Sequence, residues 1–378
     1  MKIIIAAPAH PYRGGIAEFS NRMALQFQSE GHDVSIVTFS LQYPGFLFPG
    51  KTQYTDSPAP ETLKIVRKLN SVNPVNWLIN GTKIKRQKPD ILLLRFWLPF
   101  MGPCLGTIAR ITGSNNHTKV ICIFDNVVPH EKRPGDRLLT RYLTKNIDGA
   151  IVMSATVKEE LEVFRSDMPV KFSPHPLFDN YGGLVPEEYA KAALNLDPGF
   201  SYILFFGFIR AYKGLDILLD AFADKRLRGR KIKLLIAGEF YENDASYRKQ
   251  ISQNGLENEI MIFDRFIKDQ EVPLFFGAAD IIVQPYRSAT QSGVTQIAFH
   301  YEKPMLVTDV GGLKEIIADG KCGYVSKPDP ESIADSIVDF YDNNRKYRFI
   351  QGVKEEKQKF AWDKMTSAIL DVYKQIEK

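Results

Sequence analysis

The stretch YILFFGFIRAYKGLDILLDAF, from Tyr202 to Phe222, decides the fold of this 378-residue chain. Its continuous apolar start predicts a strand that is buried on both faces. A short polar loop follows, and Gly214 opens an apolar-patterned segment that predicts a helix. A buried strand, a loop and a helix in this order form the repeating unit of a parallel α/β sheet.

The same alternation extends in both directions from this stretch. We expect further strands at KIIIAAPA, DVSIVTF, ILLLRFW, KVICIFD, GAIVMS, KLLIAG, IMIFDRF, DIIVQPY and PMLVTDV. These segments predict two doubly wound, Rossmann-like domains at about 1–180 and 202–360, joined by a linker at 181–201, with a final helix at 361–378. Ligands of such sheets bind outside the carboxyl ends of the strands, so we expect the site in a cleft between the two domains.

The composition excludes several classes of protein. Three distant cysteines, scattered histidines and the absence of an Asp-x-Asp pair give no disulfide framework and no metal site, so neither a metal nor a cofactor is expected. The formal net charge of +5 weakly favours an anionic ligand or an anionic membrane surface, or reflects solubility alone. No nucleic-acid partner is expected. The start MKIIIAAPAH predicts a strand rather than a signal peptide, so we expect a cytoplasmic protein.

Two cations stand in the loop that follows the strand YILFFGF. Arg210 and Lys213 precede the helix that begins at Gly214. A helix N-terminus attracts anions, and the two cations neutralise a diphosphate without a metal ion. The alternative is a pair of solvated charges near a turn. The sequence therefore predicts a diphosphate site here.

A second helix start has the sequence TQSGV, directly after the strand DIIVQPY. The amides of the residues at this start are free to hold phosphate oxygens: Gln291, Ser292, Gly293 and Val294. The alternative is a simple N-cap by Thr290 or Ser292, and both roles can hold at once.

Two loops of the N-terminal half are candidate binding elements. Gly14 and Gly15 follow the first strand and open a helix, where glycine permits close approach of a ligand or forms a plain tight turn. The loop is not G-x-G-x-x-G, which disfavours a nicotinamide-dependent dehydrogenase. His130, in FDNVVPHEKRPGDR, can exchange a proton with a substrate hydroxyl, or its loop is a charged surface loop.

Taken together, these motifs resemble a known family. The combination of RGGIAEF, GFIRAYKGLDILLDAF, IAGEFY, FDRFIKDQEVPLFFGAADIIVQPY, TQSGV, EKPMLVTDVGGLKEII and WDKM is similar to the retaining nucleotide-sugar glycosyltransferases of family four, which have the GT-B fold. The resemblance implies transfer of a sugar from a nucleotide diphosphate donor to a glycan or lipid-linked acceptor, as in polysaccharide biosynthesis. It also implies retention of configuration and no need for a metal.

The resemblance assigns roles to individual residues. It makes Arg210 and Lys213 the diphosphate-binding pair and places Gly15 near the diphosphate. It places His130 beside the donor sugar as the catalytic candidate. It implies that the nucleobase contacts the backbone at Phe266 and Ile267, and that the helix around Trp362 crosses back onto the first domain.

One feature of the family is missing. The common form has Glu, seven residues and Glu, but Ala289 and Ile297 occupy those positions. Gln291 or Gln296 can hydrogen-bond hydroxyls of the ribose or sugar, yet neither supplies a charge. We interpret the QSG sequence as a subfamily difference. The alternatives are a non-catalytic protein that binds a nucleotide sugar or glycan, or a sugar-nucleotide epimerase on the same fold.

The apolar segment from Phe96 to Leu105 allows two interpretations. With the basic charge balance, it allows peripheral contact with the inner face of a membrane and with a lipid-linked acceptor. A buried connection between a strand and a helix explains the segment equally well.

Overall fold

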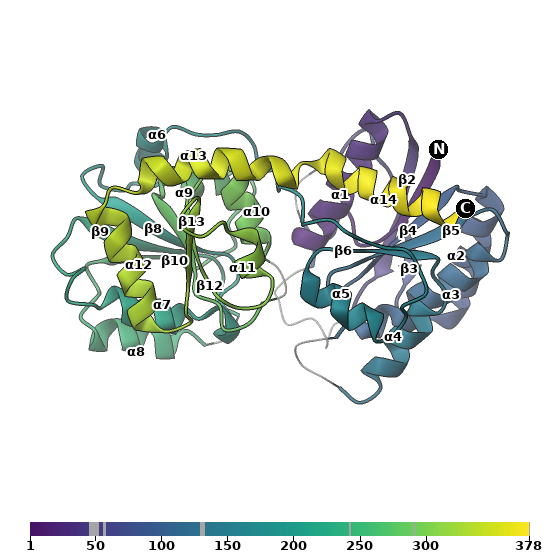
Figure 1. Cartoon of the computed structure of the whole chain (residues 1–378), viewed down its shortest axis with the longest axis horizontal. Coiled ribbons are helices and arrows are strands. Elements are labelled where there is room, and N and C mark those ends of the chain that lie inside the picture. The colour runs from purple at the N-terminus through teal and green to yellow at the C-terminus, as the bar shows by residue number, and fades with distance from the viewer. Residues whose placement is uncertain (45–52, 56–57, 129–132, 242, 290–291, 378) are drawn as a thin grey trace. The chain divides into compact units, whose positions relative to one another are not determined.

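The computed structural model describes residues 1–44, 53–55, 58–128, 133–241, 243–289 and 292–377. Its contacts divide the chain into two compact units. The N-terminal unit comprises Met1–Pro176 and Ala361–Lys378, and the C-terminal unit comprises Leu177–Phe360 (Figure 1). Each unit is a parallel sheet with helices on both faces.

The sheet of the N-terminal unit has the order β3-β2-β1-β4-β5-β6-β7. Its strands are β1 (Lys2–Ala6), β2 (Asp33–Leu41), β3 (Lys64–Asn70), β4 (Ile91–Phe96), β5 (Lys119–Phe124), β6 (Gly149–Val152) and β7 (Val170–Phe172). The connecting helices are α1 (Gly15–Ser29), α2 (Pro74–Gln87), α3 (Gly102–Gly113), α4 (Asp136–Thr144) and α5 (Ala155–Glu162). The central strands are mostly apolar and buried, as expected of parallel strands covered on both faces. The exception is Arg95 of β4, a buried cation that pairs with Asp125.

The edge strand β3 was not predicted. Its sequence KIVRKLN carries three cations, and much of it is exposed. An edge strand in contact with water needs no continuous apolar run, so it lacks the pattern that identified the central strands.

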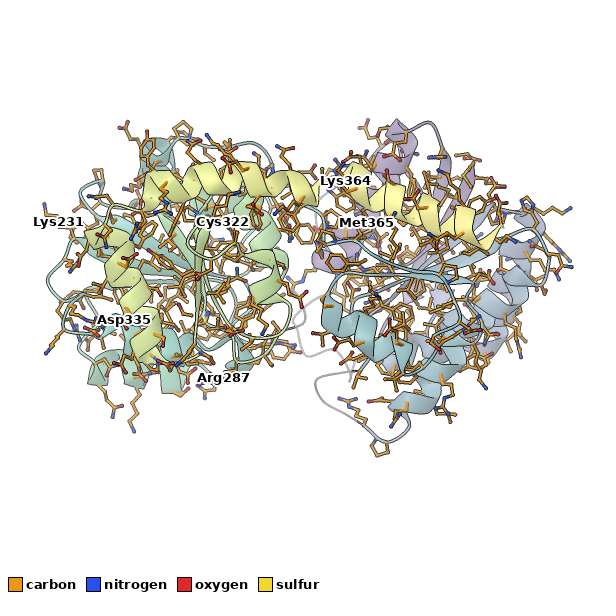
Figure 2. All side chains as sticks on the ribbon, in the orientation of Figure 1. Lys231, Arg287, Cys322, Asp335, Lys364 and Met365 are labelled. Carbon is orange, nitrogen blue, oxygen red and sulfur yellow. The ribbon has the colours of Figure 1, made fainter. Side chains whose placement is uncertain are left out.

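The last helix, α14 (Trp362–Ile376), belongs to the N-terminal unit. The ring of Trp362 lies 5.0 Å from that of Phe19, centroid to centroid, and Thr366 donates to Glu30 over 2.7 Å. A Cβ on Gly149 of β6 would lie 2.5 Å from Val372, which shows how closely the helix approaches the sheet. Figure 2 labels Lys364 and Met365 on this helix.

The sheet of the C-terminal unit has the order β10-β9-β8-β11-β12-β13. Its strands are β8 (Ser201–Phe206), β9 (Ile232–Ala237), β10 (Ile260–Phe263), β11 (Ile281–Gln284), β12 (Met305–Thr308) and β13 (Gly323–Ser326). One face carries α6 (Glu187–Ala193), α9 (Val272–Ala278), α10 (Gly293–His300) and α13 (Lys346–Glu356) (Figure 1). The other carries α7 (Leu215–Phe222), α8 (Ala245–Gln253) and α12 (Pro330–Asp342), and the short helix α11 (Leu313–Ile316) follows β12.

The segment 181–201, predicted as a linker, is part of the C-terminal unit. It contains α6, which packs against α9. A Cβ on Gly277 of α9 would lie 3.0 Å from the Cβ of Ala190, and Glu187 pairs with Lys346 over 2.8 Å. It was predicted as a linker because it interrupts the alternation of strands and helices, whereas these long-range contacts hold it against α9 and α13.

The apolar segment from Phe96 to Leu105 lies inside the N-terminal unit. Phe96, Met101, Cys104 and Leu105 are completely buried in its core. The segment is therefore the buried connection between β4 and α3, and the interpretation as a membrane contact is wrong for these residues. Among the described residues, no helix combines the length and apolar character that crossing a membrane requires.

Candidate functional site

The strand order of the C-terminal unit determines where its loops meet. The strands β8, β9 and β10 follow one another toward one edge of the sheet, and β11, β12 and β13 follow one another toward the other edge. The strands β8 and β11 are neighbours, so the loops at their carboxyl ends leave in opposite directions and open a crevice, which is where such sheets bind ligands. Arg210 and Lys213 lie in the loop after β8, and Ser292 lies in the loop after β11.

The two loops are fastened to each other. Residues Ala211–Lys213 form the one-turn helix η3. The backbone N–H of Arg287 donates to the carbonyl of Tyr212 over 2.7 Å. The Arg287 guanidinium also binds the Asp216 carboxylate at 2.7 Å and the carbonyl of Ala211 at 3.0 Å. Arg287, labelled in Figure 2, therefore fixes η3 and the start of α7 against the segment after β11.

Glycine at two positions permits this close approach. Gly214 has φ +67°, and a Cβ there would lie only 2.0 Å from the carbonyl oxygen of Pro285. Gly207 has φ +95°, and a Cβ there would lie 3.2 Å from the Lys213 ammonium and 3.6 Å from a methyl group of Val294. The end of β8, the Lys213 ammonium and the first turn of α10 therefore meet at one place.

The Lys213 ammonium lies between the end of β8 and the first turn of α10. Its side chain is only 8% exposed, and among the described residues no carboxylate lies within salt-bridge distance of it. Burial lowers the pKa of Lys213, and the neighbouring charge of Arg210 lowers it further, while Tyr212 opposes the shift. A buried cation without a counter-ion is costly, so this position favours an incoming anion.

Arg210 is held in place by an aromatic ring. Its guanidinium carbon lies 3.7 Å from the ring centroid of Tyr241, in the loop after β9. The N–H of Tyr241 donates to the carbonyl of Ile209 over 3.0 Å, which ties the two loops together. Stacking fixes the guanidinium plane and leaves its N–H groups available to a diphosphate.

The start of α10 is capped by Ser292. Its hydroxyl accepts the N–H of Val294 over 3.3 Å and lies 3.4 Å from the Tyr286 hydroxyl. The N-cap role of Ser292 is therefore present, and the Val294 amide already has an acceptor. A Cβ on Gly293 would lie 2.8 Å from the ring of Phe178, so packing also requires glycine there. Gln291, with Thr290, lies outside the described residues.

The predicted contacts to the nucleobase and ribose differ in accessibility. Phe266 is 38% exposed in the loop after β10, where the Arg265–Glu271 ion pair at 2.6 Å closes the loop. Ile267 is 6% exposed and packs inward. Gln296 is completely buried on α10, and neither atom of its amide has a hydrogen-bond partner among the described residues. Gln296 therefore lies in the interior of the unit rather than at its surface.

The two positions that lack the acids of the Glu-x7-Glu pattern are apolar and buried. Ala289 and Ile297 both lie in the protein interior, and the Ala289 carbonyl accepts the N–H of Gly312 over 3.2 Å. Within the part of the chain that the structure describes, no three His, Cys, Asp or Glu side chains gather as metal ligands would.

In the N-terminal unit, Gly15 begins α1 at the carboxyl end of β1. The order of this sheet also reverses between β1 and β4, so the loop that contains Gly15 lies at the equivalent switch point. Gly14 has φ +99°, and Arg95, which binds the Asp125 carboxylate at 2.7 Å, reaches the carbonyl of Ile16 at 3.5 Å.

The catalytic candidate His130 lies outside the described residues. Val128 and Arg133, on either side of its loop, line a cavity of about 330 Å³ in the N-terminal unit. Val127, Thr140, Glu160 and Phe164 complete much of its mainly apolar wall.

Part of the chain matches a known protein family. Residues 201–343 match the family described as Glycosyl transferases group 1. An uncharacterized glycosyltransferase of Methanocaldococcus jannaschii is 24% identical over 382 residues, covering 100% of this chain and 99% of the relative.

Solved structures share the fold over the whole chain. A glycosyltransferase from Rickettsia africae has a TM-score of 0.75 at 18% identity, covering 100% of this chain and 98% of its own. The Anabaena protein HepE, solved in complex with UDP, has a TM-score of 0.75 at 14% identity, covering 99% of this chain and 100% of its own. The predicted fold class, two Rossmann-like α/β domains of the GT-B type, is confirmed.

Several residues of this candidate site were not singled out from the sequence. Tyr241 orients Arg210, and the ion pair of Arg287 with Asp216 positions η3. Gly207 leaves room for the Lys213 ammonium. Tyr241 stands three residues after the predicted strand KLLIAG, in the loop at its carboxyl end, and this position is the signal that would have identified it.

Proposed function

We propose that the protein transfers a glycosyl unit from a nucleoside diphosphate sugar to a glycan or lipid-linked acceptor. The observation that carries the proposal is the buried ammonium of Lys213, which lacks a described carboxylate partner and lies beside the start of α10 at the switch point of the sheet. The UDP in the HepE structure, a protein of the same fold, makes UDP the first nucleotide to test.

The chemistry that these groups support is stabilisation of a leaving diphosphate. As the glycosidic bond to the donor breaks, negative charge grows on the diphosphate oxygens, and Lys213 and Arg210 are already oriented to receive it. Two fixed cations supply positive charge of the kind that a metal ion supplies elsewhere. Metal independence therefore belongs to the proposal.

Retention of configuration also belongs to the proposal. Ala289 and Ile297 are buried and supply no carboxylate, and in this proposal a diphosphate oxygen accepts the acceptor's proton on the face from which the diphosphate leaves. The acceptor oxygen then bonds to the anomeric carbon on that same face. His130 is the proposed contact to the donor sugar, Gly15 to the diphosphate, and Phe266 with Ile267 to the nucleobase. We further propose a cytoplasmic location.

Incubation with a panel of nucleotide sugars tests the activity. We expect one donor to release its nucleoside diphosphate, faster with an acceptor than without, and equally fast in the presence of a chelator. NMR of the product should show the anomeric configuration of the donor. Nucleotide binding without turnover of any donor would instead support the non-catalytic alternative, and loss of activity with the chelator would refute metal independence.

The lowered pKa of Lys213 gives a further expected result, which concerns proton uptake. A bound diphosphate favours the charged ammonium, so it raises the pKa of Lys213 from its lowered value in the free protein. At a pH between these two pKa values, binding takes up a proton. Calorimetry of UDP binding at a series of pH values up to the ordinary lysine pKa of about 10.4, in two buffers of different ionisation enthalpy, should show this uptake. The Lys213→Met variant should show none, and equal uptake by both proteins would contradict the assignment.

A further inference from the structure

The helix α2 of the N-terminal unit exposes an unusual number of aliphatic side chains. Val75 is 62% exposed, Leu78 is 49% exposed and Ile79 is 47% exposed, and Val72, just before the helix, is 45% exposed. Four large aliphatic residues within eight positions form a contiguous apolar patch, which on a protein surface marks a site of interaction. We call these four residues the α2 patch.

The geometry of the helix separates this patch from the core. The inward face of α2 contains Asn80, Gly81 and Ile84, and a Cβ on Gly81 would lie 3.1 Å from Ile111 of α3. At 3.6 residues per turn, Val75 and Ile79 lie on the opposite face. The patch therefore faces away from the unit to which the helix belongs.

Exposed Lys and Arg residues lie on the same outward face of α2 as the α2 patch. Arg86 is seven residues after Ile79, so it lies on the same side of the helix. Lys83 lies next to it, and both side chains are exposed. On the adjoining edge strand β3, Lys64 and Lys68 are exposed as well. Hydrogen bonds from Asn76 and Asn80 to the carbonyl of Lys68, at 3.0 and 3.3 Å, hold the helix against this strand.

The charge of the whole chain is concentrated in this region. From Thr62 to Lys88 the sequence contains seven Lys and Arg residues and no Asp or Glu. The formal net charge of the chain is +5, so the remaining residues together carry −2. The mild basicity of the protein is therefore a local property of β3 and α2, next to the exposed aliphatic patch.

We propose that the α2 patch and its flanking cations bind the surface of an anionic lipid bilayer. Aliphatic side chains insert at the boundary between headgroups and acyl chains, and Lys and Arg beside them pair with anionic headgroups. Charge complementarity selects this partner, because a second copy of the chain would bring the same seven cations to the interface. The surface differs from the segment Phe96–Leu105, most of whose side chains are buried.

Vesicle flotation of the whole protein, without donor or acceptor, tests the proposal. We expect binding to phosphatidylcholine vesicles that contain about one third phosphatidylglycerol, and little binding to phosphatidylcholine alone. Each cation near such a surface contributes about fivefold to the partition coefficient, so Lys83→Gln with Arg86→Gln should lower it about 25-fold. Leu78→Asn with Ile79→Asn should lower it about tenfold or more.

Control variants test whether the loss of any exposed lysine or leucine, rather than of this surface, lowers vesicle binding. Lys225→Gln with Lys249→Gln removes two exposed charges from the C-terminal unit, and Leu138→Asn removes an exposed leucine of α4. Both controls should bind vesicles as the wild type does. Equal binding to neutral vesicles would overturn the proposal. A wild-type dimer that Leu78→Asn with Ile79→Asn dissociates would overturn it too, because the patch would then be covered by a second copy. Since no turnover is measured, the result is independent of the proposed transferase activity.

Discussion

Replacement of Lys213 by methionine is expected to weaken the binding of a nucleoside diphosphate by about 100-fold. Methionine keeps much of the aliphatic volume and removes the ammonium. Loss of one member of a buried, charge-assisted contact costs about 2–5 kcal/mol, and 100-fold corresponds to about 3 kcal/mol. Titration calorimetry of UDP with the wild type and the variant measures this difference.

Stability of the ligand-free protein distinguishes a binding role from a structural one. The Lys213 ammonium is buried and has no described carboxylate partner, so its removal should leave the thermal midpoint unchanged or raised. Lys225→Met, at an exposed lysine of the same unit, is the control and should bind UDP normally. Arg210→Ala should weaken binding about tenfold, because it removes a more exposed cation. Wild-type affinity of Lys213→Met would refute the diphosphate site.

The sequence predicts the central strands of both sheets, and it singles out two candidate cations, because these signals are local. A strand that is covered on both faces is mostly apolar, as in β6 and β8, and the sequence shows this directly. Arg210 and Lys213 follow such a strand, so the rule that ligands bind at the carboxyl ends was enough to select them.

The parts that were missed depend on distant contacts. The ion pair of Asp216 with Arg287 joins residues 71 positions apart, and no local pattern indicates that they meet. The helix α6 lacks a strong apolar stripe, and its place is set by α9 and Lys346. The burial of Gln296 likewise follows from how α10 packs on the sheet, a tertiary property that a polar residue type does not reveal.

The backbone contact at Gly214 leads to the second large effect. Gly214→Ala is expected to destabilise the C-terminal unit by about 3–5 kcal/mol and to abolish tight UDP binding. A side chain at φ +67° costs about 1 kcal/mol in strain, and its Cβ would also lie 2.0 Å from the carbonyl oxygen of Pro285. The segment after β11 would have to move away from η3, which would displace Lys213 from the start of α10.

Gly229→Ala is the matched control in the same unit. Gly229 has nearly the same φ, +69°, but a Cβ there would meet no atom within 4 Å. Its substitution should therefore cost only the strain of about 1 kcal/mol and leave UDP binding intact. Urea unfolding of the two variants, with calorimetry of UDP, isolates the contribution of the close approach. Equal destabilisation by the two substitutions would show that backbone strain alone requires glycine at position 214. A larger loss for Gly214→Ala, together with lost binding, would show that the contact with Pro285 sets the position of Lys213.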